Sequence, residues 1–149
     1  MIPGFYDPNL PGWPVPRVRA ALFLPSVPGV QNPQWFGVDF LIDTGASTSC
    51  LHPIDSIRGA NIPILTLLQD QHWSQQRDHG GIGGSAVYFP VPAVYAFMQA
   101  DGQWKVVNGE IEIAQLTLTN TRIPSLLGWD ILQQFKLWFD WTGRTIGLE

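Results

Sequence analysis

The spread of proline and glycine along the chain restricts its fold more than any other feature of the sequence. Thirteen prolines and 15 glycines are distributed over 149 residues. Both residue types disfavour a helix interior, proline by removing a backbone donor and clashing with the preceding turn, glycine by its conformational entropy. Charged residues make up only 13% of the chain, so the polar face of a long amphipathic helix has few side chains to form it. The pattern favours short strands joined by turns.

Length and charge limit the domain organisation and the partners. A chain of 149 residues is the size of one domain. We predict a single domain over 1–149, with a proline-rich N-terminal arm at 1–16, a possible pro-segment, and the folded body at 17–149. The net charge is −4 and the basic residues are scattered. A nucleic-acid-binding surface needs clustered Lys and Arg, so we expect no nucleic-acid partner.

The sequence contains no signal of secretion or of membrane insertion. Residues 1–16 lack the basic and apolar regions of a signal peptide, and no apolar run reaches the roughly 18 residues of a membrane span. Cys50 is the only cysteine, so an intrachain disulfide cannot form. We expect a soluble cytoplasmic protein with no membrane partner.

Local patterns predict several short strands and two helical turns. The expected strands are 17–24, 35–42, 86–98 with interruptions at Pro90 and Pro92, two segments within 106–119, and a closing hairpin of 135–139 and 145–148. The expected helical turns are 53–58 and 129–134, while 61–71 fits a strand or a short helix equally well. Glycine-rich turns are expected at 79–84 and 101–102. The predicted class is all-β, a barrel or a sandwich.

One aspartate stands where a strongly apolar strand ends. Asp43 follows Phe40-Leu41-Ile42. An ionised carboxylate at the end of a buried strand costs free energy, because it loses part of its hydration. Thr44 can orient it through its hydroxyl, and Gly45 permits the close approach of another backbone. Asp, Thr and Gly are also ordinary turn formers, so the tripeptide alone is only suggestive.

The surroundings of Asp43 make the chain similar to a known family. The run FLIDTGAS at 40–47 resembles the catalytic turn of the aspartic proteases, and LLGWDIL at 126–132 resembles the second motif of their single-domain, retropepsin-like members. Between them, GGIGG at 80–84 resembles the flap tip of the retroviral proteases. The three motifs occur in the order of that family. The resemblance implies a retropepsin-like acid-protease β-barrel with one short C-terminal helix, active as a symmetric homodimer.

The same resemblance implies a set of site residues and partners. Asp43 of each subunit would activate the lytic water. The active-site turn that binds substrate would comprise Thr44, Gly45 and Ala46, and the flap would comprise Gly81, Ile82 and Gly83. The implied partners are a second copy of the chain and a peptide or protein substrate, with no metal and no organic cofactor.

A single such aspartate requires a dimer, because two adjacent carboxylates are needed to supply both base and acid. Asp39 lies four residues earlier on the same strand, about 13 Å from Asp43 at about 3.3 Å per residue, so it cannot form the pair. Retroviral proteases brace their dimer with an Asp-Arg pair, and here Ser47 and Trp129 stand at those positions. We expect apolar surface to replace the pair, in the region of Trp138 and Trp141 and in the closing strand 145–148.

Other functions have weaker support. Residues 81–86 fit the dinucleotide pattern G-x-G-x-x-G/A, but that pattern must open a helix and the next segment contains two prolines. The three histidines and Cys50 lack the close paired spacing of a zinc site. The main alternative is a dimeric β-fold module that binds peptides as a scaffold, with weak or no catalysis.

Overall fold

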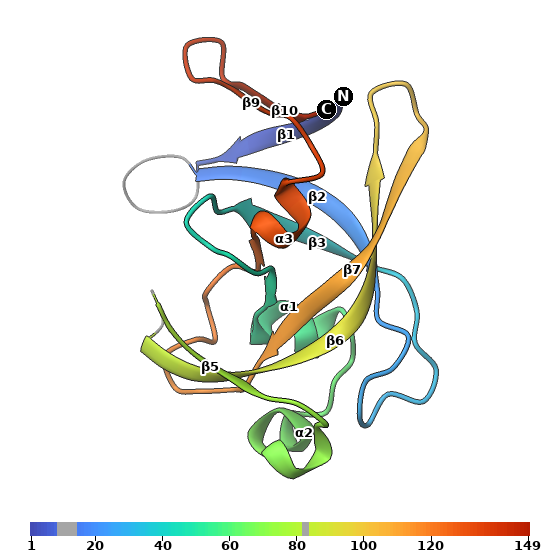
Figure 1. Ribbon diagram of the computed structural model, residues 1–149, viewed down its shortest axis with the longest axis vertical. Helices are drawn as coiled ribbons and strands as arrows, with labels where there is room; N and C mark the ends of the chain where they lie inside the picture. Colours follow the sequence, from blue (N-terminus) through green and yellow to red (C-terminus); the bar gives the residue numbers. More distant parts are fainter. Residues whose placement is uncertain (9–14, 82–83) are drawn as a thin grey trace.

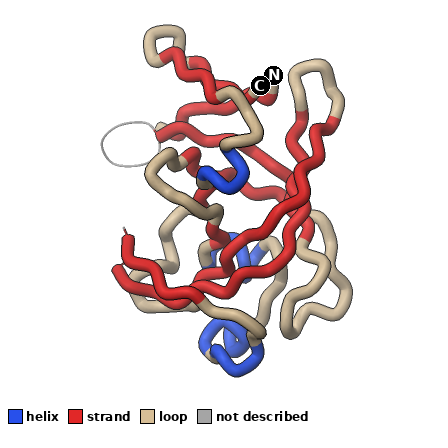
Figure 2. The backbone as a smooth tube through the Cα atoms, in the orientation of Figure 1, coloured by secondary structure: helices blue, strands red, loops and turns tan. Residues whose placement is uncertain are grey.

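The structure of the protein is a computed structural model that describes residues 1–8, 15–81 and 84–149. Within these ranges the chain is mostly β-sheet with a few short helices, which confirms the all-β prediction (Figure 2). The strands are β1 (Ile2–Asp7), β2 (Val15–Phe23), β3 (Phe36–Ile42), β4 (Cys50–Leu51), β5 (Arg77–Gly81), β6 (Gly84–Met98), β7 (Trp104–Ala114), β8 (Leu126–Leu127), β9 (Leu137–Asp140) and β10 (Thr145–Leu148). The helices are α1 (Pro53–Arg58), α2 (Ile64–Leu68), the single 3-10 turn η1 (Asp70–His72) and α3 (Trp129–Leu132).

The order of the strands in the sheet differs from their order in the chain. Within the described ranges the order is β5-β6-β7-β4-β8-β3-β2-β1-β10-β9, and β6 also pairs with β2. The pairs β3–β8 and β4–β7 are parallel, whereas their neighbours are antiparallel. The β6–β7 hairpin runs along one side of the molecule, and the two termini lie close together (Figure 1). This order places residues 41–42 beside residues 126–127, which are far away in the sequence.

Most of the predicted elements occur near their expected positions. The strands expected at 17–24 and 35–42 are β2 and β3, and the closing hairpin is β9–β10. The helical turn at 53–58 is α1, and the ambiguous stretch 61–71 contains α2 and η1. The prediction of two strand segments within 106–119 is wrong in part. One strand, β7, runs to Ala114, and residues 115–125 form a loop. None of the helices in the described parts is long and apolar enough to span a membrane.

The N-terminal segment is part of the sheet and not a separate arm. Residues 2–7 form β1, which lies between β2 and β10, with Ile2 opposite Leu148 and Gly4 opposite Val18. Ile2 is buried in the core. A Cβ at Gly4 would lie 2.6 Å from the side chain of Ile146, so glycine allows the two strands to pack this closely. Removal of residues 1–16 as a pro-segment would therefore take a strand out of the sheet.

Two prolines lie inside β6 without interrupting it. Pro90 and Pro92 pair in register with Glu112 and Glu110 of β7. On its other side, β6 pairs with β5 only as far as Tyr88 and with β2 only from residue 94 onward. Alternate residues of a strand direct their N–H groups to the same side, so the two missing donors can both face the gap between β5 and β2. The predicted interruption does not occur, because the prolines fall where a ladder partner is absent.

A single hydrophobic core joins the sheet to its short helices. Its largest fully buried side chains include Phe40, Phe89, Tyr95 and Phe97. The ring of Trp73 stacks on Phe89 at a centroid distance of 4.6 Å, which attaches the segment after α2 to β6. In the closing hairpin, β9 is the edge strand of the described sheet, and β10 contributes Ile146 and Leu148 to the core.

Ile146→Ala is expected to lower the free energy of unfolding by about 2–4 kcal/mol, because the side chain is 3% exposed and its loss leaves a cavity between β10 and β1. Chemical denaturation monitored by tryptophan fluorescence measures the change. Val106→Ala is the matched control on a β-strand, since Val106 is 57% exposed and its truncation should cost less than about 0.5 kcal/mol. Equal effects of the two substitutions would contradict the assignment of β10 to the core.

Candidate active site

The turn after β3 holds the carboxylate of Asp43 in a fixed position. The backbone N–H of Gly45 donates to Oδ1 of Asp43 at 2.9 Å, and that of Ala46 donates to the carbonyl of Asp43 at 3.2 Å. The side chain of Asp43 is half-buried, whereas Thr44 and Gly45 are exposed. Asp43, Thr44, Gly45 and Ala46 therefore form one compact turn, in which one carboxylate oxygen of Asp43 is bound by the backbone.

The segment of β8 lies directly beside this turn. Leu41 and Ile42 of β3 pair in parallel with Leu126 and Leu127, and the backbone N–H of Asp43 donates to the carbonyl of Leu127 at 3.1 Å. Gly128 follows immediately. A Cβ at Gly128 would lie 2.6 Å from the carbonyl carbon and oxygen of Thr48, so only glycine allows the two segments to cross at this distance. The two motifs recognised in the sequence are thus in contact.

Trp129 contacts the turn through two hydrogen bonds. Its indole Nε1 donates to the carbonyl of Thr44 at 2.7 Å, and its backbone N–H donates to the carbonyl of Ala46 at 2.9 Å. The backbone N–H of Asp130 donates to the carbonyl of Ser47 at 3.1 Å. The beginning of α3 therefore supports three successive parts of the turn with neutral hydrogen bonds. The sequence identified Trp129 as a departure from the family pattern, but it did not predict this contact.

A buried serine and an aspartate connect the turn to α3. The hydroxyl of Ser49 donates to Oδ1 of Asp130 at 2.7 Å, and the backbone N–H of Ser49 donates to Oδ2 at 3.0 Å. The same hydroxyl accepts the backbone N–H of Gly128 at 2.9 Å. Both carboxylate oxygens of Asp130 thus accept hydrogen bonds within the chain. This contact makes Asp130 a structural residue and a poor candidate for the second catalytic carboxylate.

The glycine-rich segment forms a hairpin, as predicted. Strands β5 and β6 are antiparallel, with His79 opposite Ala86 and Gly81 opposite Gly84. The predicted flap residue Gly81 is the last residue of β5. Ile82 and Gly83 lie outside the described residues. In Figure 1 the hairpin end and the loop that follows β3 both extend toward the left of the view. Because residues 84–98 form the strand β6, the G-x-G-x-x-G/A pattern does not precede a helix. The segment therefore lacks the structure of a dinucleotide-binding motif.

A cluster of titratable side chains lies at the base of this hairpin. His52 follows β4, and its two ring nitrogens lie 2.8 Å from the carbonyl of Pro124 and 3.2 Å from the hydroxyl of Tyr88. Burial lowers the pKa of His52 and raises the pKa of Cys50 to about 12, the latter also because Glu112 lies nearby. Both groups are therefore neutral near pH 7. No set of three or more His, Cys, Asp or Glu side chains in the described ranges is arranged to hold a metal ion.

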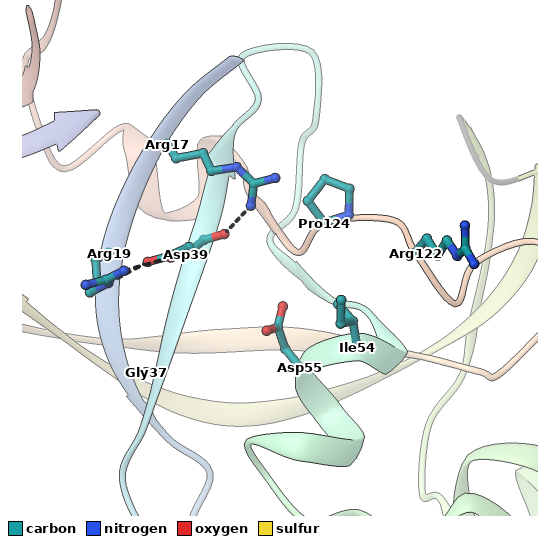
Figure 3. Close-up of a pocket in the computed structure, with 8 residues that line it drawn as sticks. All are labelled: Arg17, Arg19, Gly37, Asp39, Ile54, Asp55, Arg122 and Pro124. Atoms are coloured by element: carbon teal, nitrogen blue, oxygen red, sulfur yellow. Dashed lines mark hydrogen bonds and ion pairs between the residues drawn. The ribbon is translucent and has the colours of Figure 1, made fainter. Parts of the chain in front are cut away.

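A surface pocket of about 600 Å³ lies between strands β2 and β3 on one side and α1 and the segment 122–124 on the other, and none of its lining residues belongs to the turn 43–46 (Figure 3). Its lining residues are Arg17, Arg19, Gly37, Asp39, Ile54, Asp55, Arg122 and Pro124. Asp39 binds Arg19 through both carboxylate oxygens, at 2.6 and 2.9 Å. Asp55 accepts a hydrogen bond from Ser125 at 2.5 Å, and burial raises the pKa of Asp55. Asp39 is therefore paired within its own sheet and is not a partner for Asp43.

No model of a known protein family matches the chain, and no curated protein matches it.

Ser49→Ala is expected to reduce stability by about 1–3 kcal/mol, because it leaves the N–H of Gly128 without its acceptor and removes one of the two donors to Oδ1 of Asp130, the other being the N–H of Ile131. Thermal and denaturant unfolding measure the loss. Ser47→Ala, at an exposed position of the same turn, is the matched control and should change stability by less than about 0.5 kcal/mol. If the Ser49→Ala protein is as stable as the control, the Ser49 hydroxyl does not stabilise the turn.

Proposed function

We propose that the chain is a retropepsin-like aspartic endopeptidase, active as a symmetric homodimer with a barrel-like fold of each subunit. The observation that carries this proposal is the contact between the two motifs, in which the Asp-Thr-Gly turn rests against residues 126–128. A turn formed only by local preference would need no such support. Here a backbone hydrogen bond from Asp43, a close crossing at Gly128 and an indole hydrogen bond to Thr44 all hold the same turn.

The chemistry follows from bringing two copies of Asp43 together. Two adjacent carboxylates cannot both ionise easily, so they share a proton, as in aspartic proteases in general. The ionised group takes a proton from water, and the protonated group donates a hydrogen bond to the carbonyl oxygen of the scissile peptide. The N–H of Gly45 holds one oxygen of each Asp43. Exposure of Thr44 and Gly45 leaves this surface open to a partner subunit and to substrate.

The second carboxylate must come from a partner, because the other nearby aspartates have different roles. Asp39 is paired with Arg19, and Asp130 is bound by Ser49. A two-fold axis beside the turn places Asp43 of the partner subunit opposite the first. Trp129 is 44% exposed while its indole N–H holds Thr44, so its ring is available to the dimer contact next to the catalytic turns.

The closing hairpin offers a second contact, although by a different strand from the one expected. Both edges of β10 are already paired, with β1 and β9, so the predicted strand 145–148 cannot extend a sheet into a partner. The outer strand β9 has a free edge in the described sheet and carries exposed Trp138 and Phe139, with Trp141 just beyond it. An exposed apolar edge of this kind is a site of association between chains. We assign the strand contact of the dimer to β9.

Asp43→Asn is expected to lower cleavage of a denatured protein substrate by about 100-fold or more across acidic to neutral pH, because an amide cannot act as the base. The fold should persist, since the Asn side-chain oxygen can still accept the N–H of Gly45. Asp39→Asn, in the strand β3 that precedes the turn, is the control and should keep activity near the parent level. Cleavage by Asp43→Asn within tenfold of the parent would refute the catalytic assignment and leave a peptide-binding scaffold as the function.

Specific activity is expected to fall when the protein is diluted below its dimer dissociation constant, because each site needs two copies of Asp43. The dimer should persist in about 1 M sodium chloride, since apolar contact is not screened by salt whereas exposed ion pairs are. Trp138→Glu should shift sedimentation toward the monomer and reduce activity in parallel. Full activity of a monomer in analytical ultracentrifugation would contradict the dimeric site.

A further inference from the structure

The imidazole of His52 joins two segments that lie far apart in the sequence and that both border the candidate site. His52 follows β4 and is 2% exposed. Its Nδ1 lies 2.8 Å from the carbonyl oxygen of Pro124, and its Nε2 lies 3.2 Å from the hydroxyl of Tyr88. Pro124 precedes β8, whereas Tyr88 belongs to the hairpin strand β6. One buried ring therefore contacts both segments at the same time.

The two partners determine which ring nitrogen of His52 carries the proton. A carbonyl oxygen can only accept, so Nδ1 must donate to Pro124. Burial lowers the pKa of His52, so the ring is neutral near pH 7 and has a single N–H group. Nε2 is therefore an acceptor, and the hydroxyl of Tyr88 donates to it. The bridge thus has one defined direction, from Tyr88 through His52 to Pro124.

The segment that precedes β8 supports the strand that leads into the candidate turn. The backbone N–H of Leu41, two residues before Asp43, donates to the carbonyl of Ser125 at 2.9 Å. The hydroxyl of Ser125, which is fully buried, accepts the backbone N–H of His52 at 3.0 Å and donates to Asp55 at 2.5 Å. His52 therefore binds this segment through its backbone as well as through its ring.

The segment on the other side of the ring is the hairpin of β5 and β6. The pairing of these two strands begins with Tyr88 opposite Arg77 and ends with Gly84 opposite Gly81. Tyr88 thus lies at the base of the hairpin, where it also pairs with Ala114 of β7. A hydrogen bond from the Tyr88 hydroxyl therefore holds the hairpin at its base, beside the segment that precedes β8.

A buried ring with both nitrogens bonded resists displacement. Removing one partner leaves a buried donor or acceptor without a hydrogen bond, which costs more than the bond contributes when it is formed. If the hairpin moves away from the segment that precedes β8, His52 loses either Tyr88 or Pro124. The placement of the two segments is therefore coupled through the ring.

We propose that His52 is a positioning residue, which sets the hairpin of β5 and β6 at a fixed spacing from the segment that supports the Asp43 turn. In the proposed protease this is the spacing between the flap and the catalytic turn, so the role of His52 in catalysis rests on the proposed function. The coupling of the two segments does not rest on it, because none of the contacts of the ring involves residues 43–46.

Hydrogen exchange of the full-length protein tests the coupling without any need for catalysis. Tyr88→Phe removes only the hydroxyl and keeps the ring and the backbone pairing of β6. It should speed the exchange of the Leu41 and Asp43 amides about threefold or more, because the unpartnered Nε2 loosens the segment that binds them. The amides of β10, near the other end of the strand order, should change less. Equal acceleration of all these amides, or none at Leu41 and Asp43, would overturn the proposal.

His52→Asn is the conservative comparison, because the side-chain amide of asparagine can still donate to Pro124 but cannot reach Tyr88. It should speed exchange as much as Tyr88→Phe does. The double variant should show no further acceleration, since both substitutions remove the same hydrogen bond. Effects that multiply in the double variant would mean that Tyr88 and His52 do not act together. If the His52 variants do not fold, the Tyr88→Phe comparison decides alone.

The same two substitutions at other sites are the matched controls. Tyr6→Phe removes a tyrosine hydroxyl from β1, and His72→Asn replaces an exposed histidine that contacts Gln69. Both variants should leave the exchange of the Leu41 and Asp43 amides at the parent rate. Acceleration in the controls equal to that in Tyr88→Phe would refute a specific role of His52.

The tautomer of His52 provides a spectroscopic test. Long-range ¹H–¹⁵N correlation spectra at about pH 7 should show the proton of the neutral ring on Nδ1. The Nδ1–H form should persist in Tyr88→Phe, because the bond to Pro124 remains. A proton on Nε2 would contradict the proposed direction of the bridge, since that form cannot donate to Pro124.

Measurements on Asp43→Asn separate this proposal from the catalytic one. Tyr88→Phe should change amide exchange equally with and without the Asp43 carboxylate. In the active protein, Tyr88→Phe should lower kcat/KM at a temperature where the protein remains fully folded, whereas Tyr6→Phe should not. Full activity of Asp43→Asn would defeat the proposed function and leave the exchange result valid.

Discussion

The crossing of residues 126–128 beside the turn after β3 is the contact on which the architecture of the candidate site depends. The parallel pairing of β3 and β8 allows the N–H of Asp43 to donate to the carbonyl of Leu127. The absence of a side chain at Gly128 lets residues 126–128 pass close to the backbone of Thr48. Any Cβ at this crossing would push the turn outward. Close packing of the two backbones therefore fixes the position of the aspartate.

The candidate site is held by hydrogen bonds, not by an ion pair between the turn and α3. The indole of Trp129 donates to the carbonyl of Thr44, and the hydroxyl of Ser49 donates to the carboxylate of Asp130, so both bonds hold the turn and α3 together. A hydrogen bond from an indole costs less desolvation than a guanidinium would, and the exposed ring supplies apolar area at the same time. This arrangement suits a chain in which only 13% of the residues are charged.

Charge is instead concentrated away from the turn, in contacts between strands. Arg19 binds Asp39 between β2 and β3, and Glu112 binds β5 across β6. The first pair is exposed and contributes little to stability, whereas the second surrounds a buried carboxylate and links the hairpin to the interior. The same type of ion pair therefore has different consequences in the two places, and burial is the cause.

The sequence by itself determined the strand-rich class, most strand positions and the turn of Asp43, because hydrophobic alternation and proline and glycine positions act locally. It could not determine the place of β1, which depends on pairing with β10 at the other end of the chain. Nor could it determine the burial of Glu112. Its alternation with Ile111 and Ile113 is typical of an outward side chain, but the side chains of Arg77 and His79 reach Glu112 from β5, on the other side of β6. Such burial arises only when distant strands pack together, so the tertiary structure alone decided it.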